Sequence, residues 1–380
     1  MEMKKDALYY GKAACNTLMR KFAPGQLPPC DKEAVPERSR FFYHQGVFLS
    51  GMQQIYDLCG EEKYLDYCQK WAETVIDEEG HILGQDQGIF SLGTMDFRQP
   101  GILLFLLYEK TREERYRKTL DWLVQTMKEY PVNSLGGFWH KYNSPNQMWL
   151  DGLYMTGPLL AQYAAFSGET VWLEESIRQA VIMYKHMKDP VSGLMFHAWD
   201  ESRQAPWAGR KTGLSAEIWG RAQGWFVVAL MNILDYVPKE CPIRGKLEKM
   251  ERELLEALFT YQGKDGRWCQ IVNKPDNADN WPENSCSCLF VCAAAKAIRK
   301  GILPKERIPA LERGYLGVIC SLTEETDGDL LIPDVCIGTC LGDYNFYIHR
   351  PRIANDLHGV GAFILMCAEV YRLLDSSVCP

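Results

Sequence analysis

The most constraining feature of this chain is a loose repeat of paired helical segments. Each copy has an apolar segment, a short polar break and then an amphipathic segment that carries an aromatic residue. The clear copies open at Gly46, Gly101 and Gly157. Weaker copies start near Gly224, near Ser287 and at Gly361, which gives a period of roughly 55–75 residues.

The two halves of each copy differ in how their apolar residues are distributed. The first is apolar nearly all round, as in a buried helix, whereas the second has one apolar stripe and one charged face, as in an outer helix. The sixth copy has only its first helix before Pro380, and a helix predicted over residues 7–22 supplies the missing outer partner. We therefore expect an all-α fold, an (α/α)6 barrel closed as a six-hairpin toroid. An open superhelix is the competing interpretation, and the N-terminal helix favours closure.

Short glycine-containing turns separate the copies. Examples are DEEGHIL at 77–83, SLGGFWH at 134–140 and DPVSGLMFH at 189–197, which predict loops or small hairpins. In a ring of this kind such loops gather at one rim, where function is expected. No Pro/Ser-rich linker or low-complexity run divides the chain, so we predict a single catalytic domain over residues 1–380.

Composition excludes several classes of function. The formal net charge of -7 and the pI near 5.6 argue against nucleic-acid binding. The sequence lacks 18 uninterrupted apolar residues, so a membrane span is not expected, and no signal peptide is evident. The fourteen cysteines lie mostly in apolar helical runs, where such residues behave as small buried hydrophobes. These features predict a reduced, cytoplasmic protein.

Residues 138–157, FWHKYNSPNQMWLDGLYMTG, hold the strongest catalytic candidate. Asp151 is the single carboxylate there and lies among Trp149, Tyr154 and Met155. A carboxyl group beside an aromatic ring has a raised pKa and can deliver a proton near neutral pH. The structural alternative is an aspartate at a helix N-terminus, where this residue type is favoured.

A second carboxylate has the same position in the preceding copy. Asp96, in GTMDFRQPG, precedes the Gly101 helix much as Asp151 precedes the Gly157 helix. Adjacent copies would bring both carboxylates to one rim as an acid/base pair. Each is also explained as a helix cap.

Histidines lie in the same inter-copy loops. His197 and Asp200 belong to FHAWDES, and His140 has a similar place in its own copy. A lone histidine is often structural, but these follow the glycine turns toward the predicted functional rim.

A basic residue between two indoles completes the set of candidates. Arg221 lies between Trp219 and Trp225 in WGRAQGW. A guanidinium suits a carboxylate and an indole suits the apolar face of a sugar, although helix packing alone also explains the segment. Together the candidates indicate an acidic carbohydrate in a tryptophan-lined pocket.

Other chemistries lack their motifs. The sequence contains no GxSxG, GxGxxG, Walker loop or HExxH. His, Asp and Glu are not grouped at metal-ligand spacing along the chain, so we expect neither a metal nor another cofactor.

Four segments closely resemble a known family. FWHKYNSPNQMWLDGLYM, GLMFHAWDES, WGRAQGW and NDLHGVGAFIL, within a match from about residue 41 to 373, are similar to glycoside hydrolase family 105, the unsaturated rhamnogalacturonyl hydrolases. The unsaturated glucuronyl hydrolases of family 88 are relatives. The family fold is an (α/α)6 barrel, which agrees with the repeat.

The resemblance implies hydrolysis of lyase-generated oligosaccharides that begin with a 4,5-unsaturated uronic acid, here unsaturated galacturonate linked to rhamnose. An acid protonates C4, water adds at C5, and the product opens to release the neighbouring sugar. Asp151 matches the family's general acid/base, for which a raised pKa is suitable, and Asp96 matches the assisting aspartate. The positions that match the family's substrate pocket are Tyr43, His140, Lys141, Trp149, His197, Trp219, Arg221 and Trp225.

One segment departs from the family pattern. Where the pattern has Ser-Glu-Pro, this chain has FYIHRPRIAND, with His349, Arg350 and Arg352. If this loop covers the substrate, Arg350 contacts the ligand and alters specificity while the reaction is retained. A basic surface loop without such a role is the alternative.

Rival functions remain open at this point. They are an unsaturated glucuronyl or other uronide hydrolase, a sugar epimerase on a similar toroid, and a non-catalytic carbohydrate-binding protein. The expected partner is an unsaturated oligosaccharide, with neither nucleic acid nor membrane, and the expected assembly is a monomer or homodimer.

Overall fold

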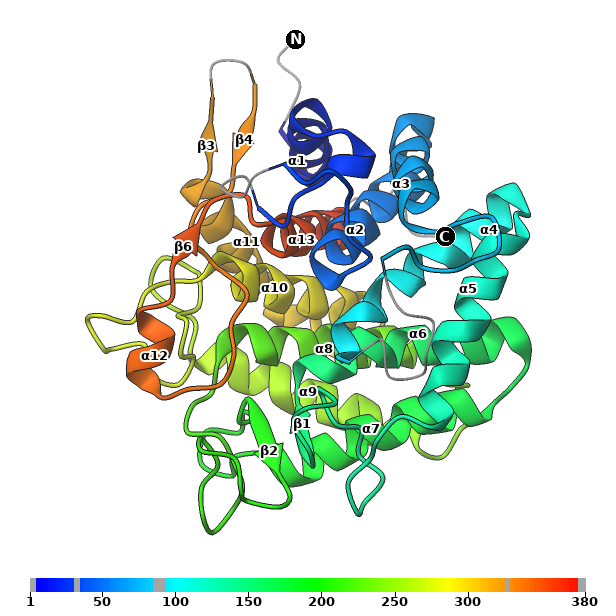
Figure 1. Ribbon diagram of the computed structural model, residues 1–380. Coiled ribbons are helices and arrows are strands. Elements are labelled where there is room, and N and C mark those ends of the chain that lie inside the picture. The colour runs from blue at the N-terminus through cyan, green and yellow to red at the C-terminus, as the bar shows by residue number, and fades with distance from the viewer. Residues whose placement is uncertain (1–4, 31–34, 85–92, 326–327, 375–380) are drawn as a thin grey trace.

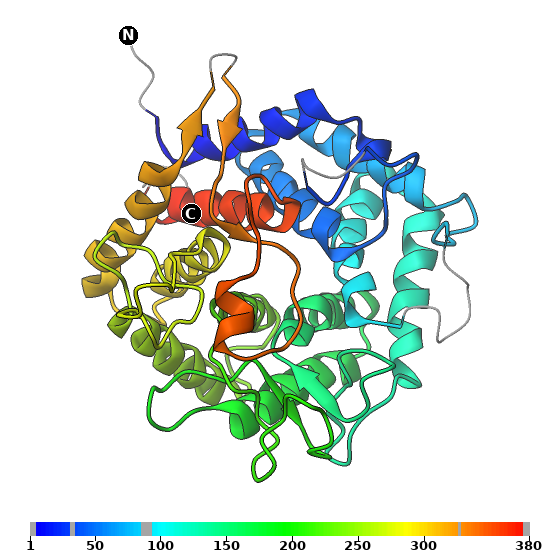
Figure 2. The ribbon, with the colours of Figure 1, turned by 60° about the vertical axis from the view of Figure 1, so that its left-hand side comes forward.

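The apolar segments of the repeat form an inner ring of helices (Figure 2). The computed structural model describes residues 5–30, 35–84, 93–325 and 328–374. Its inner helices are α2 (Tyr43–Cys59), α4 (Leu103–Thr111), α6 (Asp151–Ser167), α8 (Gly220–Leu234), α10 (Asn284–Arg299) and α13 (Leu357–Leu374). Residues on nearly every side of α6, α8 and α10 are buried, as predicted from segments that are apolar nearly all round.

The amphipathic segments form the outer ring (Figure 1). These helices are α1 (Ala7–Lys21), α3 (Glu62–Val75), α5 (Glu114–Gln125), α7 (Val171–Met187), α9 (Arg244–Thr260) and α11 (Ile308–Ser321). Short 3₁₀ turns occupy η1 (Pro24–Gln26), η2 (Met95–Phe97), η3 (Gln99–Ile102), η4 (Thr126–Lys128) and η5 (Lys305–Arg307). Each outer helix buries one stripe against its inner partner and leaves its charged face in water.

The ring is closed, which confirms the predicted (α/α)6 barrel. Each inner helix contacts the next, except that α4 and α6 are joined through η3, and α13 packs against α2. The first helix, α1, packs against the last, α13, and so completes the sixth pair as predicted.

Gly46 and Gly157 lie inside inner helices rather than at their starts, whereas Gly101 lies in η3 before α4. Gly46 lies three residues into α2, and Gly157 lies six residues into α6. Gly361 shows why glycine is required there, since a Cβ on it would lie 2.5 Å from the Val47 carbonyl carbon and 2.6 Å from Phe48 N. Closely packed helix backbones therefore explain this glycine.

Small antiparallel pairs occupy the inter-copy loops. β1 (Gln147–Trp149) pairs with β2 (Ala198–Asp200), β3 (Thr323–Glu324) with β4 (Leu330–Leu331), and β5 (Val335–Cys336) with β6 (Arg352–Ile353). Single bridges close the predicted hairpins at Ile76–Ile82, Val132–Phe138 and Lys188–Met195. The segment that carries the short helix α12 (Tyr344–Ile348) crosses the mouth of the ring (Figure 2).

Within the described residues, α13 alone is long and apolar enough to cross a membrane, and 72% of that stretch is buried inside the protein. Its apolar character is that of a core helix in the ring. The predicted domain limits, residues 1 and 380, lie outside the described ranges.

Candidate active site

The N-termini of the inner helices gather at one rim and carry most of the candidate residues. Asp151 is the first residue of α6, Tyr43 the first of α2, and Arg221 the second of α8. The β1–β2 register places Trp149 opposite Ala198, and Leu150 N donates to His197 O at 3.0 Å. This pairing joins two loops that are about 50 residues apart and brings His197 to Asp151.

His197 is fixed between Asp151 and a tyrosine. His197 Nε2 lies 3.0 Å from Asp151 Oδ2, and its Nδ1 lies 2.7 Å from Tyr347 Oη. Because an ionised carboxylate only accepts, Nε2–H donates to Asp151, and Nδ1 forms a hydrogen bond with the tyrosine hydroxyl, which can both donate and accept. The buried imidazole is therefore held in one orientation by residues from two other segments.

Asp96 has a similar relation to His140. Met95 N donates to His140 O at 3.0 Å, and Asp96 Oδ1 lies 3.8 Å from His140 Nε2. Thr94 Oγ1 donates to Asp96 Oδ2 at 3.0 Å. The two carboxylates thus each have a histidine at the same rim, as the parallel positions in the repeat predict.

The pKa of Asp151 is lowered, whereas the sequence predicts that it is raised. The carboxyl group with the raised pKa is Asp96. Burial alone would raise the pKa of Asp151, but the attraction and hydrogen bond of His197 hold it below the usual aspartate value. Burial raises the pKa of Asp96 to about 6. The raised-pKa prediction for Asp151 was wrong because it considered the nearby indole and not a histidine from the next loop.

Aromatic rings line the site. Trp149 stacks on His140 with ring centroids 4.4 Å apart, and Lys141 Nζ lies 4.7 Å above the Trp149 ring. Trp219 packs on the His197 ring at 4.7 Å. Burial lowers the pKa of His140 to about 3, so this histidine is neutral at pH 7.

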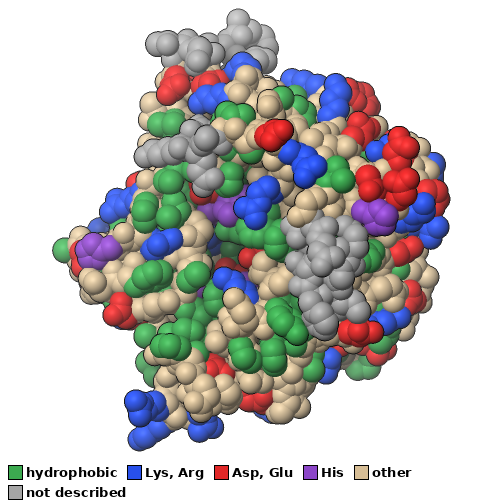
Figure 3. Space-filling model, in the orientation of Figure 1, with side chains coloured by type: hydrophobic (Ala, Val, Ile, Leu, Met, Phe, Trp, Pro, Cys, Tyr) green, Lys and Arg blue, Asp and Glu red, His purple; other side chains and the backbone are tan. Residues whose placement is uncertain are grey.

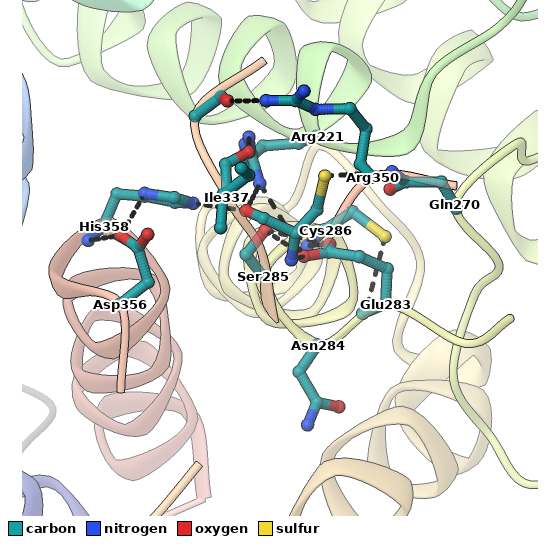
Figure 4. A network of polar contacts seen from close by, with 12 residues as sticks. Arg221, Gln270, Glu283, Asn284, Ser285, Cys286, Ile337, Arg350, Asp356 and His358 are labelled. Carbon is teal, nitrogen blue, oxygen red and sulfur yellow. Dashed lines mark hydrogen bonds and ion pairs between the residues drawn. The ribbon is translucent and has the colours of Figure 1, made fainter. Parts of the chain in front are cut away.

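Arg221 is buried and holds a loop backbone (Figure 4). Its Nη1 donates to Cys336 O and its Nη2 donates to Ile337 O at 2.8 Å. Its guanidinium also lies 4.5 Å from the Trp219 ring centroid. In this structure the arginine faces the rim and tethers β5 to the first turn of α8.

Glu283 is a buried carboxylate that the sequence reasoning missed (Figure 4). Its oxygens accept from Cys286 N at 2.6 Å and from Cys336 N at 2.9 Å, and Oε1 lies 3.8 Å from Arg221 Nη1. It therefore caps α10 and holds the same loop as Arg221. A side-chain cap before a helix was the available signal, and it did not reveal the contact with β5.

The remaining candidates have different surroundings. Tyr43 is half-buried, with its ring against His44. Trp225 is buried in the second turn of α8 and packs on Tyr154, so the structure does not bring it to the Asp151 cluster. Arg350 Nη2 donates to Gly338 O at 2.6 Å. Asp200 accepts from Ser202 N and Ala205 N and so stabilises its own loop.

Figure 3 shows a hollow near the middle of this face, edged by hydrophobic, basic and histidine side chains. A separate cavity of about 390 Å³ belongs to the other end of the barrel, because it is lined by later turns of the inner helices, including Asp235, Lys296 and Glu369. Its cations are paired, for example Lys296 Nζ with Asp235 Oδ2 at 2.6 Å and Arg299 Nη2 with Glu369 Oε2 at 2.8 Å. This cavity is therefore separate from the rim at the first turns of the inner helices, where Asp151 lies.

Comparison with known proteins identifies the family. The sequence model of Glycosyl Hydrolase Family 88 matches residues 11–374. A family 105 glycoside hydrolase of C. acetobutylicum ATCC 824 is 31% identical in the structural alignment, which covers 96% of this chain and 99% of that one with a TM-score of 0.89. The unsaturated rhamnogalacturonyl hydrolase YesR of Bacillus subtilis (strain 168) is 25% identical over 238 residues, or 61% of this chain and 64% of its own.

A more distant structure shares the fold. The unsaturated glucuronyl hydrolase of Bacillus sp. GL1 aligns over 98% of this chain and 96% of its own, with a TM-score of 0.68 and 13% identity. The family match covers nearly the whole barrel and includes both rim carboxylates. The chain therefore belongs to glycosyl hydrolase family 88 and, through its likeness to the C. acetobutylicum enzyme, to the family 105 glycoside hydrolases.

Proposed function

We propose that this enzyme releases the 4,5-unsaturated uronic acid from the non-reducing end of lyase-generated oligosaccharides, with unsaturated galacturonate linked to rhamnose as the substrate. The proposal rests on the pair of half-buried rim carboxylates, Asp151 with His197 and Asp96 with His140. The name of the B. subtilis relative supports the choice of leaving sugar. Neither carboxylate needs to attack the anomeric carbon in this reaction.

The proposed steps begin at the double bond. A carboxylic acid donates its proton to C4, the C4=C5 electron pair forms the new C–H bond, and positive charge develops at C5 and the ring oxygen. Water adds at C5 and loses its proton to the carboxylate, which restores the acid. The C5 hemiketal opens to a ketone, the hemiacetal at C1 then collapses to an aldehyde, and the neighbouring sugar leaves as an alcohol.

We assign the proton transfer to C4 to Asp151. Asp96 is assigned as the group that supplies this proton to Asp151. Below about pH 6 the free enzyme holds a proton on Asp96, whose pKa is raised to about 6, whereas the lowered pKa of Asp151 leaves that group ionised. The substrate carboxylate adds a like charge beside Asp151, which raises the pKa of Asp151 and favours its protonation. The two aspartates are therefore proposed to titrate as a coupled pair.

Arg221 and the indoles are proposed to hold the uronate. The guanidinium has five N–H groups, and its charge near the rim favours a carboxylate. Trp149 and Trp219 offer apolar surfaces suited to a sugar ring. A panel of unsaturated disaccharides with different uronates and leaving sugars tests this finer assignment, since an unsaturated glucuronide turned over faster than the galacturonyl-rhamnose would contradict it.

The test of the reaction is the near-ultraviolet absorbance of the substrate alkene. Wild-type enzyme should remove this absorbance, and Asp151→Asn should slow its loss by about 10³-fold or more because the proton donor is lost. Asp66→Asn, an exposed substitution on α3, is the matched control and should leave the rate unchanged. A folded Asp151→Asn protein with a rate within about tenfold of wild type would refute the assignment.

A further inference from the structure

Three potential ligand side chains meet where α2 packs against α13. His44 is the second residue of α2, Asp356 immediately precedes α13, and His358 is the second residue of α13. One potential ligand atom from each lies within 4.8 Å of the other two. Asp356 and His358 are buried, and the sequence separation of more than 300 residues hid the group from motif analysis.

The orientation of His358 is set by a backbone carbonyl. Its Nε2 lies 3.2 Å from Cys336 O. Because a carbonyl only accepts, Nε2 carries the hydrogen, and in a neutral ring Nδ1 then presents a lone pair. This is the arrangement common in metal-binding histidines, whose second nitrogen donates to a carbonyl or carboxylate.

The environment of that lone pair is unusual. Asp356 Oδ1 forms a close ion-pair contact with His358 Nδ1 at 2.6 Å, although the contact departs from ideal hydrogen-bond geometry. His44 Nδ1 is buried without a hydrogen-bond partner among the described residues. A lone pair and a carboxylate oxygen this close repel each other unless a positive charge lies between or beside them. A buried polar atom without a partner is also costly, so His44 Nδ1 indicates a missing ligand.

We propose that His44, Asp356 and His358 bind one divalent metal ion. Two imidazoles and one carboxylate favour zinc or a similar transition metal over calcium or magnesium, which prefer oxygen ligands. Three protein ligands leave at least one coordination position for water or another oxygen donor.

Nearby cations oppose the metal, and Arg40 is one that acts electrostatically on His44. Arg221 acts electrostatically on both His44 and Asp356. Glu283, 3.8 Å from Arg221 Nη1, offsets that charge. The site therefore has a local charge balance compatible with a bound dication.

A second His–carboxylate group provides the control. Asp77, Glu79 and His81 also have potential ligand atoms within 4.8 Å of one another. In that group His81 Nδ1 makes an ordinary hydrogen bond to Asp77 Oδ2 at 3.1 Å, at an exposed turn. The geometry there is satisfied without a metal.

The test measures bound metal rather than turnover, so its result is independent of the proposed reaction. The full chain is stripped with EDTA, incubated with a small excess of Zn²⁺, passed through gel filtration and analysed by mass spectrometry for zinc. We expect about one zinc per wild-type chain, at least a fivefold loss in His44→Ala, and no loss in His81→Ala. Less than about 0.1 zinc per wild-type chain, or equal losses in the two variants, would overturn the proposal.

A second variant covers the case in which His44→Ala does not fold. His44→Cys loaded with Co²⁺ should show a thiolate-to-cobalt charge-transfer band that Co²⁺-loaded wild-type protein lacks. Bound cobalt without that band would exclude residue 44 as a ligand. If no metal binds and NMR finds both His358 nitrogens protonated, the contact between His358 Nδ1 and Asp356 is an ordinary ion pair with a shared proton, and the proposal is wrong.

Discussion

At the residue scale, two carboxylates and two histidines from separate loops of the chain determine one another's electrostatic state. Asp151, Asp96, His140 and His197 come together at one rim, as their parallel positions predicted. The pKa order was not predictable, because it depends on which loop pairs with which. Tyr347, which fixes His197, lies 150 residues away in a segment with no local catalytic signal.

The pKa of Asp96 predicts a pH-dependent rate. If Asp96 supplies the proton of the pair, kcat/KM should be constant below about pH 6 and fall about tenfold for each pH unit above it. Asp96→Asn should remove this basic limb and lower the rate. A wild-type profile that is flat from pH 5 to pH 8 would contradict this role.

The same pKa has a consequence for stability. The folded-state pKa of Asp96, about 6, lies above the unfolded value near 3.8, so the carboxyl group lowers the free energy of unfolding as pH rises from about 4 to 6. Asp96→Asn should therefore raise the free energy of unfolding by about 3 kcal/mol at pH 8 and by little at pH 4. Urea unfolding at the two pH values measures this difference, and an equal effect at both would contradict it.

Tyr347 predicts a positioning effect on His197. Tyr347→Phe removes the 2.7 Å hydrogen bond to Nδ1 and loosens the orientation of the ring, so kcat should fall about tenfold while KM changes little. Tyr344→Phe on the same short helix is the control, since its hydroxyl contacts Asp279 instead. Equal kinetics for the two variants would show that the hydrogen bond does not position His197.

At the element scale, the helices were predictable and the rim connections were not. Hydrophobic periodicity gave the helix residues 7–22 within one residue of α1. The β5–β6 pair and α12 have too few residues for periodicity to show, and their positions depend on Arg221, Glu283 and Arg350 from other parts of the fold.

The arginines of the β6 region predict different effects on substrate binding. Arg350 is half-buried and holds Gly338 O, whereas the Arg352 side chain is 49% exposed above Trp281. Arg350→Ala should raise KM about tenfold by releasing this rim loop, and Arg352→Ala should change it less than about twofold. Steady-state kinetics on each candidate disaccharide measure both, and unchanged kinetics for Arg350→Ala would remove its role in specificity.

At the scale of the whole molecule, the repeat predicted closure of the ring but not the contact that closes it. The apolar character of α2 and α13 marks both as buried helices. Only the structure shows that Gly361 of one meets the Val47 backbone of the other. The glycines that marked the repeat thus include a position of close helix approach.

This contact predicts a large stability effect. Gly361→Ala places a methyl group against backbone atoms that cannot move aside, so it should lower the free energy of unfolding by about 3 kcal/mol. Gly245→Ala in α9, where an added Cβ has nothing within 4 Å, should raise it by about 0.5–1 kcal/mol through helix propensity. Chemical denaturation measures the free energy of unfolding of both variants. Similar small changes in the two would mean that α2 and α13 can move apart without loss of stability.

The pairing of α2 with α13 also orders events during synthesis. A ribosome adding about 10 residues per second makes Val47 roughly half a minute before Gly361. During that interval the incomplete ring presents apolar helices to solvent and to neighbouring nascent chains. The yield of folded enzyme should therefore depend on the spacing of nascent chains on its polysomes. It should also depend on chaperones that bind the exposed apolar helices until α13 has been synthesised.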